Sequence, residues 1–172
     1  LARMILQARE EGCLKEILVI VCALEIQDPR ERPMDAQQKA DEAHKQFVDD
    51  TSDFRSLLNL WAFYTEQKKQ LSHNKLRKLC HQRYLAARRM QEWRELHLQI
   101  SHQVKEMGMH LNTADAADDA ILRALLSGLV GNIGFNCEGR EYQGSHGKKF
   151  MIFPGSGLCR QKPKWLMAAE IV

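Results

Sequence analysis

The chain has 172 residues and a formal net charge of +3, and 44% of its residues are hydrophobic, 27% charged and 7% aromatic. This composition is that of a globular protein rather than a disordered or fibrous one, and the length suits one domain of average size or two small ones. The longest apolar run, Ile17 to Leu24, is far shorter than the ~20 residues of a membrane-spanning helix, so we expect no membrane partner.

The N-terminus and the cysteines indicate whether the chain is a fragment and in which cellular compartment it is expected. No signal-peptide pattern is present and the first residue is Leu1, which predicts an excised fragment. The five cysteines form no Cys-x-x-Cys pair, and their odd number leaves at least one thiol without a disulfide partner in the chain. We therefore expect buried thiols, no zinc and a cytoplasmic location.

The first 25 residues predict two helices separated by Gly12. The second, Leu14 to Glu25, is apolar nearly all round, which favours a buried helix, although its β-branched residues also suit a buried strand. Two prolines in the segment from Gln27 to Pro33 then predict a loop, because proline lacks the amide donor that a helix needs.

Three further helices are expected between residues 35 and 108. Asp35 is a candidate cap for a helix to about Val48, and Asp53 and Ser72 are candidate caps for the next two. The third pattern resumes after an interruption and ends at Gly108. The apolar side chains of the middle helix are expected in the core rather than as a stacking platform: Phe54, Leu57, Leu58, Trp61 and Tyr64.

A last helix is predicted over residues 120–129, and the character of the chain changes after Gly131. Glycines become frequent there, and two runs suit strands, Lys149 to Phe153 and Trp165 to Val172, with loops at 154–157 and 161–164. Because the last run reaches Val172 unbroken, we expect the chain to stop within a strand, leaving the β part incomplete. The fold class is therefore mainly α with a small β part.

The charges are unevenly distributed along the chain. Residues 65–105 hold ten Lys or Arg and three Glu, whereas residues 1–64 hold eight basic and twelve acidic side chains and residues 106–172 hold seven of each. A solvated helix face is the ordinary explanation of such a basic segment. A surface that faces phosphates is the alternative, because Lys and Arg gain binding free energy when they release the counterions of a polyanion.

Motifs of nucleotide-dependent enzymes are not supported by their context. Asp41-Glu42-Ala43-His44 matches an acidic box that holds Mg²⁺ in nucleotide-hydrolysing proteins, but that box requires the end of a buried strand and helical residues precede it here. No Gly-x-x-x-x-Gly-Lys-Ser/Thr sequence is present. We read the Asp41 to His44 match as accidental.

Other catalytic and metal-binding patterns are equally weak. The seven histidines show no His-x-x-x-His spacing, and Ser156 between two glycines fits a turn better than a nucleophile elbow. Glu92 and Glu95 lie among arginines and are explained as solvated ion pairs. We expect no catalytic residue and no metal site, so a free-standing enzyme is disfavoured.

Several stretches resemble one family of proteins. They are Leu1 to Leu6, Gly12 to Leu18, Leu24 to Pro33 with its Gln-Asp-Pro-Arg-Glu-Arg-Pro string, Ser52 to Phe54, Leu57 to Trp61, Leu79-Cys80, Tyr84-Leu85, Phe150 to Leu158, Lys162 to Trp165 and Ala168 to Val172. In these residues the chain resembles the C-terminal helicase-associated region of bacterial HrpA-type DEAH-box ATP-dependent RNA helicases. The resemblance spans essentially the whole chain.

The resemblance implies an architecture and partners. It implies a helical, ratchet-like domain at residues 1–110, followed at residues 111–172 by a connecting helix and a truncated OB-fold-like domain. It also implies that the parent protein carries RecA-like motor domains with ATP and Mg²⁺, that this fragment itself needs no cofactor, and that it grips single-stranded RNA while the motor moves it. The alternative is a helical protein-docking module that binds the motor domains or a cofactor protein.

The candidate RNA-binding residues are those of the basic segment and of the β-part loops: Arg77, Lys78, Arg88, Arg89, Lys148, Lys149, Ser156, Lys162 and Lys164. Base stacking would require exposed rings. Tyr142, Phe153 and Trp165 are the candidates for it, and we expect Phe153 and Trp165 to pack in the core instead.

Overall fold

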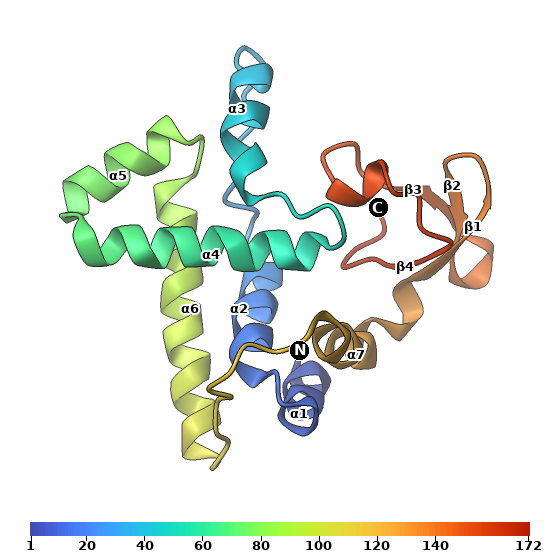
Figure 1. Ribbon diagram of the computed structural model, residues 1–172, viewed down its shortest axis with the longest axis horizontal. Helices are drawn as coiled ribbons and strands as arrows, with labels where there is room; N and C mark the ends of the chain where they lie inside the picture. Colours follow the sequence, from blue (N-terminus) through green and yellow to red (C-terminus); the bar gives the residue numbers. More distant parts are fainter.

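The computed structural model describes all 172 residues, and it shows a helical part followed by a small sheet, side by side along the longest axis of the molecule (Figure 1). This confirms the predicted fold class, mainly α with a small β part. The long helices are α1 (Ala2–Glu11), α2 (Leu14–Glu25), α3 (Gln37–His44), α4 (Asp53–Gln70), α5 (His73–Gln82), α6 (Ala87–Glu106) and α7 (Asp118–Leu129). The strands are β1 (Ile133–Glu138), β2 (Glu141–Gln143), β3 (Lys149–Met151) and β4 (Trp165–Met167).

Helix α2 lies at the centre of the helical part. It packs against α1, α4, α6 and α7, which explains why its sequence is apolar nearly all round. The segment is a helix and not a strand. Gly12 separates it from α1 as predicted, in the left-handed conformation (φ 68°), with its amide donating to the carbonyls of Ala8 and Arg9. The indole of Trp93 on α6 is fully buried and donates to the Val19 carbonyl at 3.0 Å.

The loop at residues 27–33 packs against the break between α5 and α6. Glu31 donates to the Tyr84 carbonyl and Ala86 donates to the Pro29 carbonyl, each at 2.8 Å. Arg30 pairs with Leu85 in an isolated β-bridge. These bonds satisfy backbone groups in the loop and in the break, so the two irregular segments stabilise one another.

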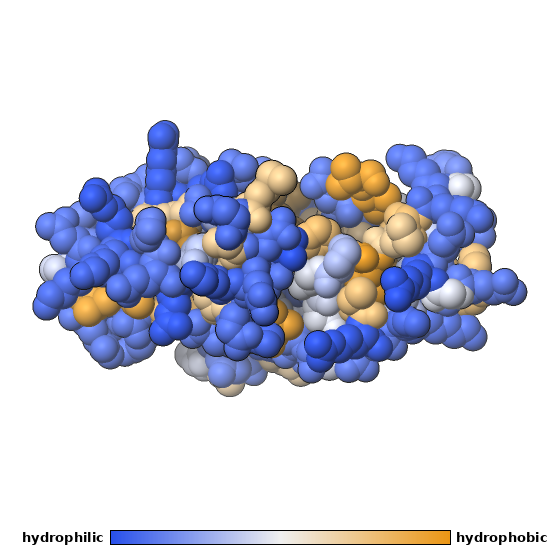
Figure 2. All heavy atoms as spheres, turned by 90° about the horizontal axis from the view of Figure 1, so that it is seen from above, coloured by the Kyte–Doolittle hydropathy of each residue, from blue (hydrophilic) through white to orange (hydrophobic).

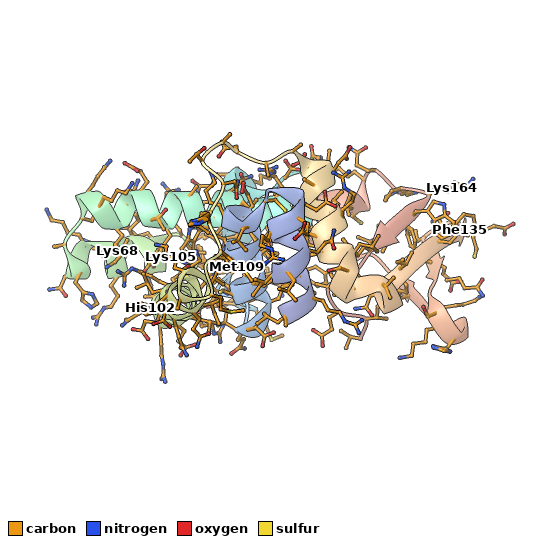
Figure 3. The ribbon with its side chains drawn as sticks, turned by 90° about the horizontal axis from the view of Figure 1, so that it is seen from below. Lys68, His102, Lys105, Met109, Phe135 and Lys164 are labelled. Atoms are coloured by element: carbon orange, nitrogen blue, oxygen red, sulfur yellow. The ribbon has the colours of Figure 1, made fainter.

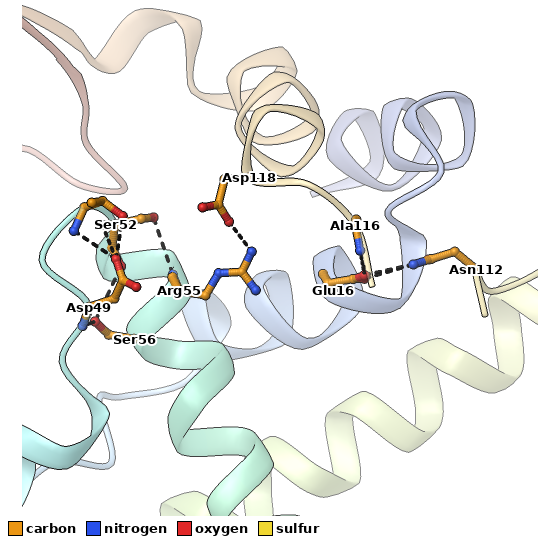
Figure 4. A network of polar contacts seen from close by, with 9 residues as sticks. Glu16, Asp49, Ser52, Arg55, Ser56, Asn112, Ala116 and Asp118 are labelled. Atoms are coloured by element: carbon orange, nitrogen blue, oxygen red, sulfur yellow. Dashed lines mark hydrogen bonds and ion pairs between the residues drawn. The ribbon is translucent and has the colours of Figure 1, made fainter. Parts of the chain in front are cut away.

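Two of the predicted helix caps are wrong. Ser52, not Asp53, precedes α4, and its hydroxyl accepts from the Arg55 amide at 3.4 Å. Ala36, not Asp35, precedes α3, which ends at His44 and continues as a short 3₁₀ turn to Phe47. Ser72 does precede α5, but its hydroxyl makes no capping bond. Ser52 is preferred because Asp49 holds the turn before α4, accepting from the amides of Thr51 and Ser52 (Figure 4).

A buried carboxylate ties α2 to the segment before α7. The carboxylate of Glu16 accepts from the Asn112 amide side chain at 2.8 and 3.0 Å and from the Ala116 backbone amide at 3.0 Å (Figure 4). Arg55 on α4 forms an ion pair with Asp118 at the start of α7. These contacts hold α7 against the bundle, where it also packs along α1.

The sheet is antiparallel with the strand order β3-β2-β1-β4. Two of the strands, β1 and β2, lie in the glycine-rich segment for which no strand was predicted. The last strand covers only Trp165 to Met167, and the five residues that follow have no regular structure. The expectation that the chain stops within a strand is therefore wrong, because β4 ends where its pairing with Ile133 of β1 ends.

The sheet part is joined to the bundle through the short 3₁₀ segment 157–159 as well as through α7. The Gly157 amide donates to Asp53 Oδ1 at 3.2 Å, and the Gly157 backbone lies so close to the Asp49 carbonyl that a methyl group would not fit. This close approach explains why a glycine occupies the position. Met167 at the end of β4 packs against the helical core.

The cysteines match the prediction in part. Cys13, Cys22 and Cys80 are buried, all five thiols are free, and Cys137 is exposed, contrary to expectation. Burial raises the pKa of Cys13 to about 11 and that of Cys22 to about 12. None of the helices is both long enough and apolar enough to cross a membrane.

Candidate nucleic-acid interface

The basic segment forms the C-terminal end of α4, all of α5 and most of α6. Six of its ten cations are exposed and form no ion pair: Lys68, Lys75, Arg77, Lys78, Arg83 and Lys105. An exposed cation that forms no ion pair can contact an anionic ligand directly, because only water and salt ions have to be displaced. Three of the six, Lys75, Arg77 and Lys78, lie on α5, at the end of the molecule opposite to the sheet (Figure 1).

The four helical candidates differ in how free their side chains are. Arg77 and Lys78 are exposed without a partner. Arg88 is exposed and pairs with Glu92 at 3.2 Å, as expected of a solvated ion pair. Arg89 is half-buried, and its guanidinium donates to the Asp28 carbonyl at 3.0 Å, which fastens α6 to the loop at residues 27–33. The geometry therefore favours Arg77 and Lys78 as ligand contacts.

The β-part candidates also have distinct roles. Lys148 and Lys162 are exposed, whereas Lys149 on β3 pairs with Glu141 at 3.2 Å. The Ser156 hydroxyl accepts from the Leu158 amide at 3.1 Å and so caps the 157–159 turn. Lys164 places its ammonium 5.7 Å from the centre of the Phe135 ring, within the range of a cation–π contact.

The structure does not bring the two sets of candidates together. In Figure 3, Phe135 and Lys164 lie at one end of the molecule and Lys68 lies at the other. The helical set and the β-part set are therefore separate surfaces. A continuous contact with both would require a ligand that spans the length of the molecule, as an extended single strand can.

The predicted assignment of the aromatic rings is reversed. Tyr142 is 1% exposed, and its hydroxyl donates to the Pro163 carbonyl at 2.7 Å. Burial raises the pKa of this phenol. Phe153 is 71% exposed and Trp165 is 63% exposed, although both were expected in the core. The reason is that Tyr142 faces the closed side of the sheet, whereas Trp165 faces the opposite side.

Sequence reasoning missed Phe135. This ring on β1 lies 4.7 Å from the Trp165 ring, centre to centre, at an angle of 54°. The alternation of Ile133, Phe135 and Cys137 is a short strand signal that could have marked this ring, although the neighbouring glycines weaken it. The position of Phe135 opposite Trp165 depends on strand register, which no local pattern gives.

A cleft of about 1770 Å³ separates the helical part from the sheet. Apolar side chains gather in this region on the face shown in Figure 2. Seven of the large exposed apolar residues of the chain line the cleft: Leu24, Leu122, Leu126, Met151, Phe153, Trp165 and Val172. Such a concentration of exposed apolar side chains is typical of a surface that another polypeptide covers.

The Asp41 to His44 motif and the possible metal ligands do not form a catalytic or metal-binding arrangement. Asp41 to His44 lie on α3, where Arg32 donates to both Asp41 oxygens at 2.7 and 2.8 Å. These bonds lower the pKa of Asp41. No three His, Cys, Asp or Glu side chains converge as metal ligands.

Comparison with known proteins assigns the family. Residues 1–102 match the ratchet-like helicase-associated domain (HA2), which confirms the resemblance, and the chain belongs to this family. Over its whole length the chain is 47% identical to the ATP-dependent RNA helicase HrpA of Escherichia coli (strain K12) and 46% identical to the HrpA homolog of Haemophilus influenzae. It is 25% identical, over 99% of its length, to the human probable ATP-dependent RNA helicase DHX35.

The chain is short beside these relatives. It spans 13% of each of the two bacterial helicases and 24% of the human protein.

Proposed function

We propose that this chain is the RNA-binding accessory region of an ATP-dependent DEAH-box RNA helicase, which grips single-stranded RNA in the cytoplasm while motor domains hydrolyse ATP. ATP and Mg²⁺ would bind to the RecA-like motor domains, which are also the partners of this region in a full-length protein. Residues 1–110 would act as the ratchet-like domain, and residues 111–172 as the connecting helix and a truncated OB-fold-like domain.

The observation that carries the proposal is the set of unpaired cations on α5. Lys75, Arg77 and Lys78 are exposed on a ten-residue helix without a single acidic residue. A solubilising surface usually mixes both signs of charge, and a one-sign surface attracts a polyanion. Family membership adds support, because the two bacterial relatives at 47% and 46% identity are named as ATP-dependent RNA helicases.

The proposal is tested by binding of the 172-residue chain to a labelled single-stranded RNA at low salt. We expect Arg77→Ala with Lys78→Ala to weaken binding. The matched control is Arg3→Ala with Lys39→Ala, which removes the same charge from exposed positions on α1 and α3. Equal losses in the two double variants would contradict a specific role for α5 and indicate a general charge effect.

The second candidate function, a protein-docking module, is favoured by the apolar cleft between the helical part and the sheet. A docking surface of this kind gains affinity from apolar burial, which salt does not screen. Replacing Leu122 and Leu126 by Ser should then abolish binding to separately produced motor domains and leave RNA binding unchanged. Loss of RNA binding in that variant would contradict docking as the role of the cleft.

A further inference from the structure

Helix α5, which carries the free cations, is held mainly by its two ends. It lies at the end of the molecule opposite to the sheet (Figure 1), and only two of its ten residues are buried, Leu76 and Cys80. Packing stabilises a helix in proportion to the apolar area that it buries, so so small a buried face fixes the direction of α5 only weakly. Its direction therefore depends on the connections to α4, at residues 71–72, and to α6, at residues 83–86.

The break between α5 and α6 (residues 83–86) has an unfavourable backbone that its neighbours hold in place. Tyr84 adopts φ 53°, in the left-handed region that a residue with a Cβ enters only at a cost. Its carbonyl accepts from the Glu31 amide at 2.8 Å and lies 3.0 Å from His44 Nε2. A carbonyl can only accept, so Nε2 carries the proton and donates it. Two donors from outside the break therefore fix this carbonyl.

Helix α3 and the loop that precedes it (residues 27–33) form one support for this break, which we call the brace. Arg32 of the loop donates to both carboxylate oxygens of Asp41 on α3, at 2.7 and 2.8 Å. The same helix reaches the break through His44, and the loop is anchored by Pro29, which is fully buried. The Asp41 to His44 segment, which forms no catalytic arrangement, thus supplies both contacts of α3.

From this arrangement we propose that the brace sets the direction in which α5 presents Arg77 and Lys78 to RNA, and that His44 is a positioning residue for these two cations. The inference rests on the proposed function and identifies the part of the molecule that controls the α5 surface. His44 is half-buried and bonded to the Tyr84 carbonyl, so it acts through the backbone of the break and not by touching the ligand. The attraction between a cation and a phosphate falls with distance, so a change in the direction of α5 weakens it.

The test compares affinities of 172-residue variants for a labelled single-stranded RNA at pH 8, where histidine is neutral and its removal leaves the net charge unchanged. His44→Ala should weaken binding by roughly 2- to 30-fold, the range for residues that act on a site through a network of contacts. His44→Gln should restore part of the loss, because its side-chain amide can donate in place of Nε2. The matched control is His110→Ala, which removes an exposed histidine from the segment after α6 and should have no effect.

A second variant disturbs the break from the side of the loop, again without a change of charge. Ala86→Pro removes the amide that donates to the Pro29 carbonyl, while the φ of Ala86, −71°, suits proline. The matched control is Ala117→Pro, because Ala117 precedes α7 in the same way, with φ −68°. RNA binding should weaken in the Ala86 variant and not in the Ala117 variant. Circular dichroism should show that every variant remains helical.

A double-mutant cycle distinguishes positioning from a general loss of folded protein. If His44 acts through the cations of α5, His44→Ala should have no further effect in a chain that already carries Arg77→Ala and Lys78→Ala. The same fold loss in both backgrounds would overturn the inference in favour of a folding effect.

The remaining outcomes separate this inference from the proposed function. Unchanged affinity in His44→Ala, where Arg77→Ala with Lys78→Ala does weaken binding, would overturn the inference and leave the α5 surface standing. No binding of RNA by the unmodified chain at low salt would overturn both.

Discussion

Glu16 is the one charged residue that is buried in the helical core, at 6% exposure. All of its polar contacts come from the segment before α7, through Asn112 and the Ala116 amide. A buried carboxylate is tolerated only where hydrogen bonds replace its lost water. Glu16 therefore helps to hold the 112–116 segment, and with it the start of α7, together with Lys15, whose amide donates to Asn112 Oδ1 at 2.8 Å.

Replacing Glu16 by Ala should lower the free energy of unfolding by about 1–3 kcal/mol, because it removes the acceptor of the Ala116 amide and one of the acceptors of the Asn112 side chain. Glu16→Gln should cost less, since one acceptor oxygen remains. Urea unfolding of the two variants and the unmodified chain measures the difference. If Glu16→Ala unfolds at the same urea concentration as the unmodified chain, the network does not stabilise the fold.

At the scale of single residues, exposure of charge and burial of the rings of Phe54 and Tyr64 could be predicted from the sequence, whereas exposure of the aromatic rings in the β part could not. Arg77 and Lys78 are exposed as expected, because burying an unpaired charge is costly. Tyr142 and Trp165 exchange their expected places, because the closed face of a short strand depends on register and on the segments that cover it. Neither is a local property of the sequence.

At the scale of elements, the packing of α4 on α6 includes a histidine. The His97 ring lies 4.7 Å from the Trp61 ring, centre to centre. Burial, with a smaller contribution from Lys105, lowers the pKa of His97 below its ordinary value near 6.5. Around pH 6.5, and from there down to the lowered pKa, His97 binds more protons in the unfolded chain than in the folded chain. The free energy of unfolding therefore falls as the pH is lowered.

The contact between α4 and α6 should therefore weaken on acidification from pH 7.5 through 6.5 and downward to the lowered pKa of His97. His97→Gln cannot titrate, so its stability should depend less on pH over the same range. Urea unfolding at several pH values measures both slopes. Identical slopes in the two proteins would show that His97 does not contribute to the pH dependence.

The segment 157–159 is the second element-scale contact, because it attaches the sheet to the start of α4. Gly157→Ala should displace it, since the new methyl group would meet the backbone of Asp49 and Asp50. Gly155→Ala is the matched control, because its methyl group would meet only the movable, exposed ring of Phe153. Limited proteolysis should cleave the Gly157 variant faster near this segment. Equal cleavage of both variants would contradict the proposed attachment.

Helices were predicted better than strands. The reason is that helix signals lie close together in the sequence, whereas a strand depends on partner strands elsewhere in the chain. The boundaries of α1 and α2 follow from Gly12 and from apolar spacing, both of which are local signals. The strands β1 and β2 contain or adjoin glycines that disfavour strands, and they form because β1 pairs on both sides. The caps of α3 and α4 were misplaced by one residue, within the usual uncertainty of helix ends.

At the scale of the whole molecule, the candidate cations of α5 and those of the sheet part lie on two separate surfaces, and an apolar cleft lies between the helical part and the sheet. The sequence alone identified the cations of both surfaces but not their separation, because the distance between α5 and the sheet depends on the arrangement of the whole bundle. The cleft could not be predicted either, since its apolar residues come from α2, α4, α7 and the sheet part, which lie far apart in the sequence.

The most direct test of the account is the salt dependence of single-stranded RNA binding by the 172-residue chain. Each phosphate that a lysine or arginine neutralises should contribute about −0.7 to the slope of log affinity against log salt concentration. We expect a steep negative slope that becomes shallower by about 1.4 in the Arg77→Ala, Lys78→Ala variant, if each side chain contacts one phosphate. A flat plot, or no binding at low salt, would contradict RNA binding as the function of this chain.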